Sequence, residues 1–132
     1  MNCPCGGASP PAAPAYDACC GRYHAGALHL QAPDAQSLMR SRYSAFVLDR
    51  LDYLLATWHA DTRPPALAPN PPGLQWLGLE VRHHAMSGDD RATVEFVARS
   101  KLGGRAERLH EISRFVRENG RWLYLDGETP RR

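Results

Sequence analysis

The sequence lacks the features that mark membrane, secreted and cofactor-binding proteins. Its 132 residues contain no apolar run close to the roughly 18 residues that a membrane-spanning helix needs. The first residues have neither the basic nor the apolar stretch of a secretory leader, so we expect a cytoplasmic protein. No Gly-rich phosphate loop, dinucleotide fingerprint or Ser-His-Asp order is present, which argues against nucleotide-binding enzymes and serine hydrolases.

Lysine is nearly absent, and neither sign of charge dominates. Lys101 is the only lysine among 16 basic residues, and 14 acidic residues leave a net charge of +2. A bias toward arginine is more often a habit of composition than a sign of anion recognition. The balanced charge makes nucleic acid an unlikely partner, and RNA or ribosome association is the weakest of three candidate functions.

Cysteine is absent beyond residue 20. The four thiols belong to Cys3, Cys5, Cys19 and Cys20. In a reducing compartment such a cluster indicates metal or redox chemistry before disulfides. Four thiolates suit tetrahedral Zn²⁺ and leave no open position, so we predict a structural zinc ion held by all four. Redox-active thiols, or thiols with no joint role, are the alternatives, and His24 or His29 could replace one cysteine as a ligand.

The chain divides into a Cys-rich segment, residues 1–24, and a larger domain, residues 34–132. Within the first, residues 6–15 form a Gly-, Pro- and Ala-rich loop with nothing to bury. Asp34 is a good N-cap for a helix over residues 35–48, because its carboxylate can accept from free N–H groups of the first turn. A second amphipathic helix is predicted over residues 50–58.

Alternating apolar residues after position 73 predict four strands. Their ranges are 75–87, 91–102, 105–118 and 121–126. Gly103-Gly104 and Asn119-Gly120 are hairpin signals between consecutive strands. The fold class is therefore α+β, with two N-terminal helices packed on a curved four-stranded antiparallel sheet and a small zinc knuckle before them.

The cysteine pattern resembles the SEC-C motif, the zinc-binding tail motif of the bacterial preprotein translocase motor. That motif has Cys-x-Cys, a spacer of about eight residues, and then Cys followed by His or Cys. This chain has thirteen residues between Cys5 and Cys19 and lacks the basic residues usual in the spacer. The resemblance implies a zinc ion and a protein partner, because the motif in the translocase is an interaction tag.

The chain as a whole resembles the YchJ-like family of small bacterial proteins. The matching stretches are residues 38–46 (LMRSRYSAF), 57–59 (TWH), 76–79 (WLGL), 95–99 (EFVAR), 111–115 (EISRF) and 122–127 (WLYLDG). The family joins a SEC-C segment to a domain similar to nuclear transport factor 2, a cone of curved sheet packed on helices. The resemblance implies this fold and no particular activity.

A pocket is expected where the helices meet the third strand. On that strand Glu111, Ser113 and Phe115 share the face that we take as inward. We place six residues in the pocket: Arg42, Trp58, His59, Glu111, Ser113 and Arg114. A buried Glu111 needs a partner. The partner is either Arg40 or Arg42 in a structural ion pair, or Glu111 is a general base assisted by His59 or Ser113.

These observations favour a binding protein over an enzyme. The first hypothesis is a zinc-stapled adaptor that contacts a protein partner. The alternative is a small-molecule isomerase, dehydratase or hydrolase with Glu111 as base, His59 as a further catalytic candidate, and Arg42 or Arg114 as anion anchor. A homodimer through the open sheet face is compatible with the pattern, although nothing in the sequence requires one.

Overall fold

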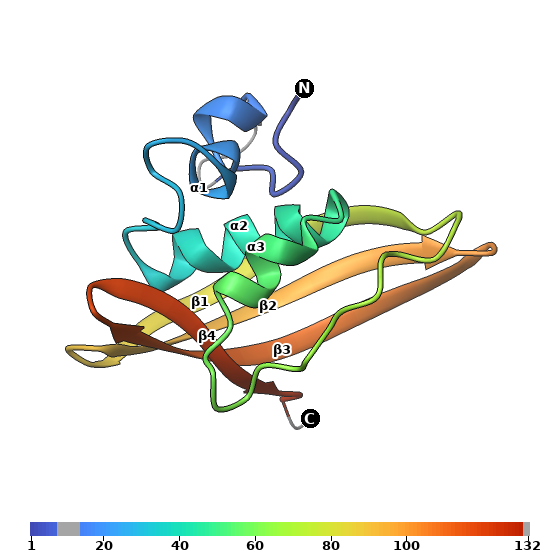
Figure 1. Ribbon diagram of the computed structural model, residues 1–132. Helices are drawn as coiled ribbons and strands as arrows, with labels where there is room; N and C mark the ends of the chain where they lie inside the picture. The colour runs from blue at the N-terminus through green and yellow to red at the C-terminus, as the bar shows by residue number, and fades with distance from the viewer. Residues whose placement is uncertain (8–13, 131–132) are drawn as a thin grey trace.

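The computed structural model describes residues 1–7 and 14–130, and it has the predicted α+β architecture. Its elements in chain order are η1 (Tyr16–Ala18), α1 (Gly21–His24), α2 (Ala35–Val47), α3 (Leu51–Ala56), β1 (Gln75–Gly88), β2 (Arg91–Leu102), β3 (Arg105–Glu118) and β4 (Arg121–Glu128). Figure 1 shows α2 and α3 across one face of the curved sheet, with the N-terminal segment on the other side of the helices. No helix among the described residues is long and apolar enough to cross a membrane.

The helix α2 begins where the sequence predicts it. The Asp34 Oδ1 atom accepts a hydrogen bond of 2.7 Å from the backbone N–H of Ser37, which satisfies a free donor of the first turn. The helix is buried on more than one side, because Leu38 and Met39 pack in the core while Ser41 and Ser44 are also buried. Because the sheet covers one side of α2 and the N-terminal segment covers the other, this helix is the middle layer of the molecule.

The helix α3 is shorter than predicted, and its end shapes the pocket. It ends at Ala56, two residues before the predicted end at Trp58. The chain then runs beside β4, where the backbone N–H of Tyr124 donates to the Thr57 carbonyl and that of His59 donates to the Tyr124 carbonyl, both at 2.8 Å. Pairing with β4 thus replaces the last helical hydrogen bonds and fixes the direction of Trp58.

The sheet is an antiparallel meander in the order β1-β2-β3-β4. Asn119 and Gly120 form the β3–β4 turn with φ of 53° and 77°, the left-handed values that an Asn-Gly hairpin turn requires. The last strand extends two residues beyond the predicted Asp126, because β3 offers pairing partners as far as Glu128. The predicted order and turns of the strands are confirmed.

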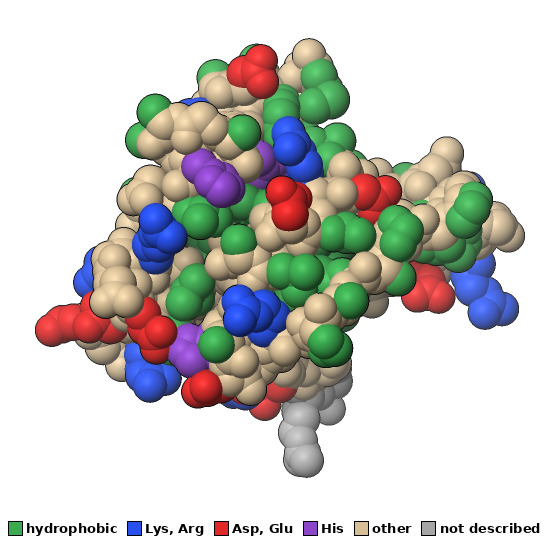
Figure 2. All heavy atoms as spheres, in the orientation of Figure 1, with side chains coloured by type: hydrophobic (Ala, Val, Ile, Leu, Met, Phe, Trp, Pro, Cys, Tyr) green, Lys and Arg blue, Asp and Glu red, His purple; other side chains and the backbone are tan. Residues whose placement is uncertain are grey.

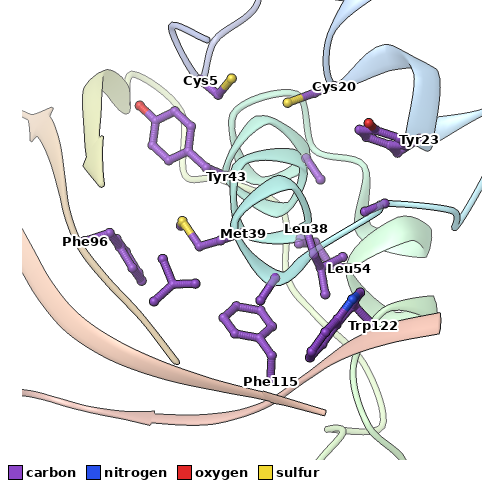
Figure 3. Packing of buried hydrophobic residues seen from close by; sticks show 14 of the residues in the cluster. Cys5, Cys20, Tyr23, Leu38, Met39, Tyr43, Leu54, Phe96, Phe115 and Trp122 are labelled. Atoms are coloured by element: carbon purple, nitrogen blue, oxygen red, sulfur yellow. The ribbon is translucent and has the colours of Figure 1, made fainter. Parts of the chain in front are cut away.

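The core lies between α2 and the concave face of the sheet. Figure 3 shows Phe115 and Trp122 on the sheet side of α2, with Cys5 and Cys20 on its opposite side. Phe115 is 1% exposed and Leu54 is fully buried. Aromatic side chains of this size contribute much of the apolar area removed from water in a small domain.

Candidate metal centre and pocket

Within the Cys segment, residues 1–24, backbone contacts join residues 1–3 to residues 14–16. The N–H of Cys3 donates to the Pro14 carbonyl at 2.8 Å, and the N–H of Tyr16 donates to the Met1 carbonyl at 2.9 Å. An isolated bridge pairs Asn2 with Ala15. These contacts bring the second cysteine pair next to the first. Residues 8–13 of the predicted Pro- and Ala-rich loop lie outside the described residues.

The four sulfur atoms form one compact cluster. All lie within 4.8 Å of one another. The Cys5 Sγ atom is 3.7 Å from the Cys3 Sγ atom and 3.6 Å from the Cys19 Sγ atom. Zn–S bonds of about 2.3 Å in a tetrahedron give S–S edges of about 3.8 Å. The cluster therefore fits a tetrahedral ion with small adjustments, and Cys3, Cys5, Cys19 and Cys20 would hold it.

Polar groups around the cluster favour negative charge on sulfur. The backbone N–H of Gly7 donates to the Cys5 Sγ atom at 3.2 Å, and the Ser44 hydroxyl lies 3.5 Å from the Cys3 Sγ atom. The guanidinium of Arg40 donates to the Cys5 carbonyl, and that of Arg22 donates to the Cys19 carbonyl. Two cations thus lie near a site where four thiolates and one divalent ion would leave two negative charges.

Contacts within the cluster shift the pKa values of Cys3 and Cys20 in opposite directions. The hydrogen bond from Cys20 lowers the pKa of Cys3, and the same contact raises the pKa of Cys20. Burial raises the pKa of Cys19 to about 12. Because metal binding requires deprotonated thiols, a bound ion would supply the attraction that removes the remaining protons.

His24 is a structural link between the Cys segment and α2, not a ligand in this cluster. Its Nε2 atom donates to the Ser41 carbonyl at 2.8 Å, so its Nδ1 atom accepts from the Tyr16 hydroxyl at 2.6 Å. Burial lowers the pKa of His24, which favours this neutral form. Its ring also lies 4.6 Å from the Tyr53 ring. His29 is exposed and lies outside the sulfur cluster.

A cavity of about 290 Å³ lies between α2 and the sheet. Its walls come from α2, Trp58 of the segment after α3 and all four strands, and most are aromatic or aliphatic. Glu111, Ser113 and Phe115 of β3 all line it, so this face of the strand points inward as predicted. Trp76, Tyr43 and Tyr124 line it as well, and sequence reasoning missed them. Tyr124 is two residues from the buried Trp122 on β4 and so shares its face of the strand, which was the available signal.

Glu111 is held by its neighbours on β3 and β4. Its Oε2 atom accepts from the Ser113 hydroxyl at 2.6 Å and from the Tyr124 hydroxyl at 3.3 Å. The carboxylate lies directly over Gly127, where any added Cβ atom would collide with it. A residue larger than glycine at position 127 would therefore push this carboxylate out of its present position.

Arg42 is the buried cation of the cavity. Its Nη1 atom donates to the Leu54 carbonyl at 2.8 Å and to the Thr57 hydroxyl at 2.7 Å. The guanidinium also lies over the rings of Trp58 and Tyr124, at 5.0 Å and 4.6 Å. Burial lowers the pKa of Arg42 to about 10, far enough above neutral pH to leave it charged. Among the described residues no ion pair joins it to Glu111, which differs from the structural pair considered above.

Two residues predicted for the pocket lie elsewhere. His59 donates from its Nε2 atom to Glu118 at 2.8 Å and accepts at Nδ1 from the backbone N–H of Asp61, so both ring nitrogens face away from the cavity. Arg114 is on the opposite face of β3, where its Nε atom lies 2.6 Å from Asp126. Neither lines the cavity, whereas Arg42, Trp58, Glu111 and Ser113 do.

Comparison with known proteins identifies the family. The model for the YchJ middle NTF2-like domain matches residues 34–127. The chain belongs to the YchJ family. A UPF0225 protein of Methylibium petroleiphilum is 70% identical over 97% of this chain and 88% of its own length. A second UPF0225 protein, from Bordetella pertussis, is 63% identical over 96% of this chain and 92% of its own length.

Two solved structures share the fold over the whole chain. One is the solution structure of a SEC-C motif containing protein from Rhodopseudomonas palustris, with 32% identity, a TM-score of 0.78, and coverage of 99% and 100% of the two chains. The other is the crystal structure of a SEC-C motif containing protein from Psychrobacter arcticus, with 28% identity and the same TM-score, covering 100% of this chain and 84% of that one. The SEC-C resemblance and the NTF2-like domain are therefore both supported.

Proposed function

We propose that this YchJ-family chain is a non-catalytic binding protein whose Cys segment is held by a structural zinc ion and presented to a protein partner. The observation that supports this most directly is the sulfur cluster, whose four thiols are enough to fill a tetrahedral site. A site closed in this way has no position for a reacting molecule. The ion would hold a surface in shape instead of performing chemistry.

The position of the Cys segment supports a role at the surface. Its inner side is occupied by α2, through the contacts of His24 and Arg40 described above. Figure 1 shows its outer side away from the sheet and from α3. The connector that follows the segment carries Leu28, which is 47% exposed. The resemblance of the motif to the interaction tag of the translocase points in the same direction.

The alternatives have less support. On the face that Figure 2 shows, acidic and basic side chains are interspersed, so that face does not offer a nucleic-acid groove. An enzyme with Glu111 as base has lost one of its two predicted assisting groups. His59 is bonded to Glu118 outside the cavity, so that Ser113 alone of the two lies beside the carboxylate.

The test compares the partners that are captured by three forms of the full chain. A partner of the Cys segment should be captured by the wild-type protein and lost with Leu28→Asp, which changes the outer surface. It should be retained with Leu77→Asp, a matched change at a 55% exposed leucine of β1. Loss with Cys3→Ser/Cys5→Ser would add that the ion is needed. Identical partner lists for all forms would exclude this function.

A further inference from the structure

The cavity beneath α2 contains polar groups that the proposed partner role does not use. Both hydrogen bonds that Arg42 donates to the described residues come from its Nη1 atom. The residue is 5% exposed, and no carboxylate among the described residues forms an ion pair with it. A buried guanidinium is costly when its direct partners are two neutral oxygens and two aromatic faces. The Glu111 carboxylate lies near enough to act on the charge of Arg42 but forms no ion pair with it.

Two further donors in the cavity wall are also unused. The indole Nε1 atoms of Trp58 and Trp76 are buried and have no hydrogen-bond partner within the described ranges. Both residues line the same cavity as Arg42. Buried N–H groups are nearly always paired, so two unpaired donors within residues that line one cavity are unusual.

The apolar walls and the volume of the cavity indicate what the rest of the ligand is like. Tyr43, Phe46, Phe96 and Phe115 supply flat apolar surface, and the Tyr43 and Trp76 rings meet edge to face at 5.7 Å. A cavity of about 290 Å³ lies at the lower end of the range for small-molecule sites, about 300–1,000 Å³. It therefore suits a molecule with one ring rather than a nucleotide or a peptide.

We propose that this cavity binds a small aromatic monocarboxylate, with its carboxylate against Arg42 and its ring among the aromatic walls. A planar guanidinium matches the geometry of a carboxylate. Glu111 in the same wall disfavours phosphate and dicarboxylates, because a second negative charge would lie near its own. The most exposed residues that line the cavity are also apolar, since Leu109 is 49% exposed and Phe46 is 36% exposed. They suit a ligand whose ring is apolar.

The experiment uses the metal-loaded full chain, with benzoate as the charged probe and benzyl alcohol as its neutral counterpart. The indole N–H signals of the three tryptophans are followed by NMR during each titration. Benzoate should shift the signals of Trp58 and Trp76 and leave that of Trp122, which is buried in the core, in place. We expect at least about tenfold weaker binding of benzyl alcohol, equivalent to about 1.4 kcal/mol.

Variants then test the two charges separately. Glu111→Gln should tighten benzoate binding several-fold, because it removes a like charge while keeping the shape. Arg42→Met should abolish the preference for benzoate over benzyl alcohol, and Arg114→Met on the outer face should change nothing. If Arg42→Met does not fold, the comparison of the two probes on the wild-type chain and on Glu111→Gln decides the question.

Three results would overturn the proposal. The first is the absence of benzoate binding at millimolar concentration, and the second is equal binding of benzyl alcohol. The third is weaker benzoate binding by Glu111→Gln. The cavity and the Cys segment are on different sides of α2, so failure here leaves the capture experiment with Leu28→Asp unaffected.

Discussion

The two sides of α2 are held by different forces. Toward the sheet, the helix packs against aromatic side chains such as Phe115 and Trp122, both nearly inaccessible to solvent. Away from the sheet, it meets four thiols and a few hydrogen bonds, chiefly those of His24 and Arg40. The first side is stabilised mainly by apolar burial, whereas the second has too little apolar area for a core of its own. The comparison teaches that one helix can join an apolar core to a segment with little core of its own, which we propose is held by an ion.

Removing the ion should produce the largest difference between the two sides. Structural Zn²⁺ in small peptides contributes about 10–16 kcal/mol of folding free energy at neutral pH. With chelator, or in Cys5→Ser, we expect the backbone amides of Cys3 and Tyr16 to lose hydrogen-exchange protection. The amides of β2 and β3 should keep theirs. A Cys segment that stays protected without metal would contradict the account.

A large-to-small substitution in the core should weaken the sheet side of α2 and leave the zinc content unchanged. Phe115→Ala removes a buried ring and should cost about 3–5 kcal/mol in the free energy of unfolding, measured with denaturant. The exposed control Leu77→Ala should stay within about 0.5 kcal/mol of the wild type. Zinc content under native conditions should be unchanged in both variants. Loss of zinc from folded Phe115→Ala protein would show that the two sides are not independent.

Extremes of pH should affect opposite sides of α2. Burial raises the pKa of Tyr43 and Tyr124, which line the cavity on the sheet side, to about 12, above the usual value of about 10. Since these phenols are neutral when folded, the stability they contribute is complete below pH 10 and is lost as pH rises toward 12. Acid should instead release zinc first, because protons compete for thiolates. Tyrosinate absorbance and zinc release measure the two transitions, and a shared acid transition would contradict this division.

Cutting one polar link should give the smallest effect. Tyr16→Phe removes the hydroxyl that donates to the Nδ1 atom of His24, and one such hydrogen bond contributes about 0.5–1.5 kcal/mol. We expect faster hydrogen exchange within the Cys segment and no change in global unfolding. Tyr23→Phe is the matched control, because the Tyr23 hydroxyl is not part of this link. If the two changes had equal effects, the hydrogen bond between Tyr16 and His24 would not contribute to holding the Cys segment.

The features that could be predicted from the sequence are those that depend on residues close together in the chain. Alternation and the Asn119-Gly120 turn predicted the strands, and Asp34 predicted the start of α2. The cysteine cluster followed from its composition. Alternation along β3 also placed Arg114 opposite Glu111, so its inclusion in the pocket went against a pattern already present.

Contacts between distant residues could not be predicted in this way. His24 bonds to the carbonyl of Ser41, and no side-chain pattern indicates which backbone oxygen will be near. His59 was misplaced because α3 ends early, where pairing with Tyr124 overrides the helical pattern of the sequence. The inward direction of Arg42 was predicted, whereas its stacking over Trp58 and Tyr124 depends on that same early end.

The most direct test is the zinc content of protein purified without added metal, determined by elemental mass spectrometry. The account predicts one equivalent of zinc per chain in the wild type and a marked loss in Cys5→Ser, with no loss in Leu77→Ala. A wild-type chain with no metal and four freely titratable thiols would contradict the central claim that an ion holds the Cys segment on α2.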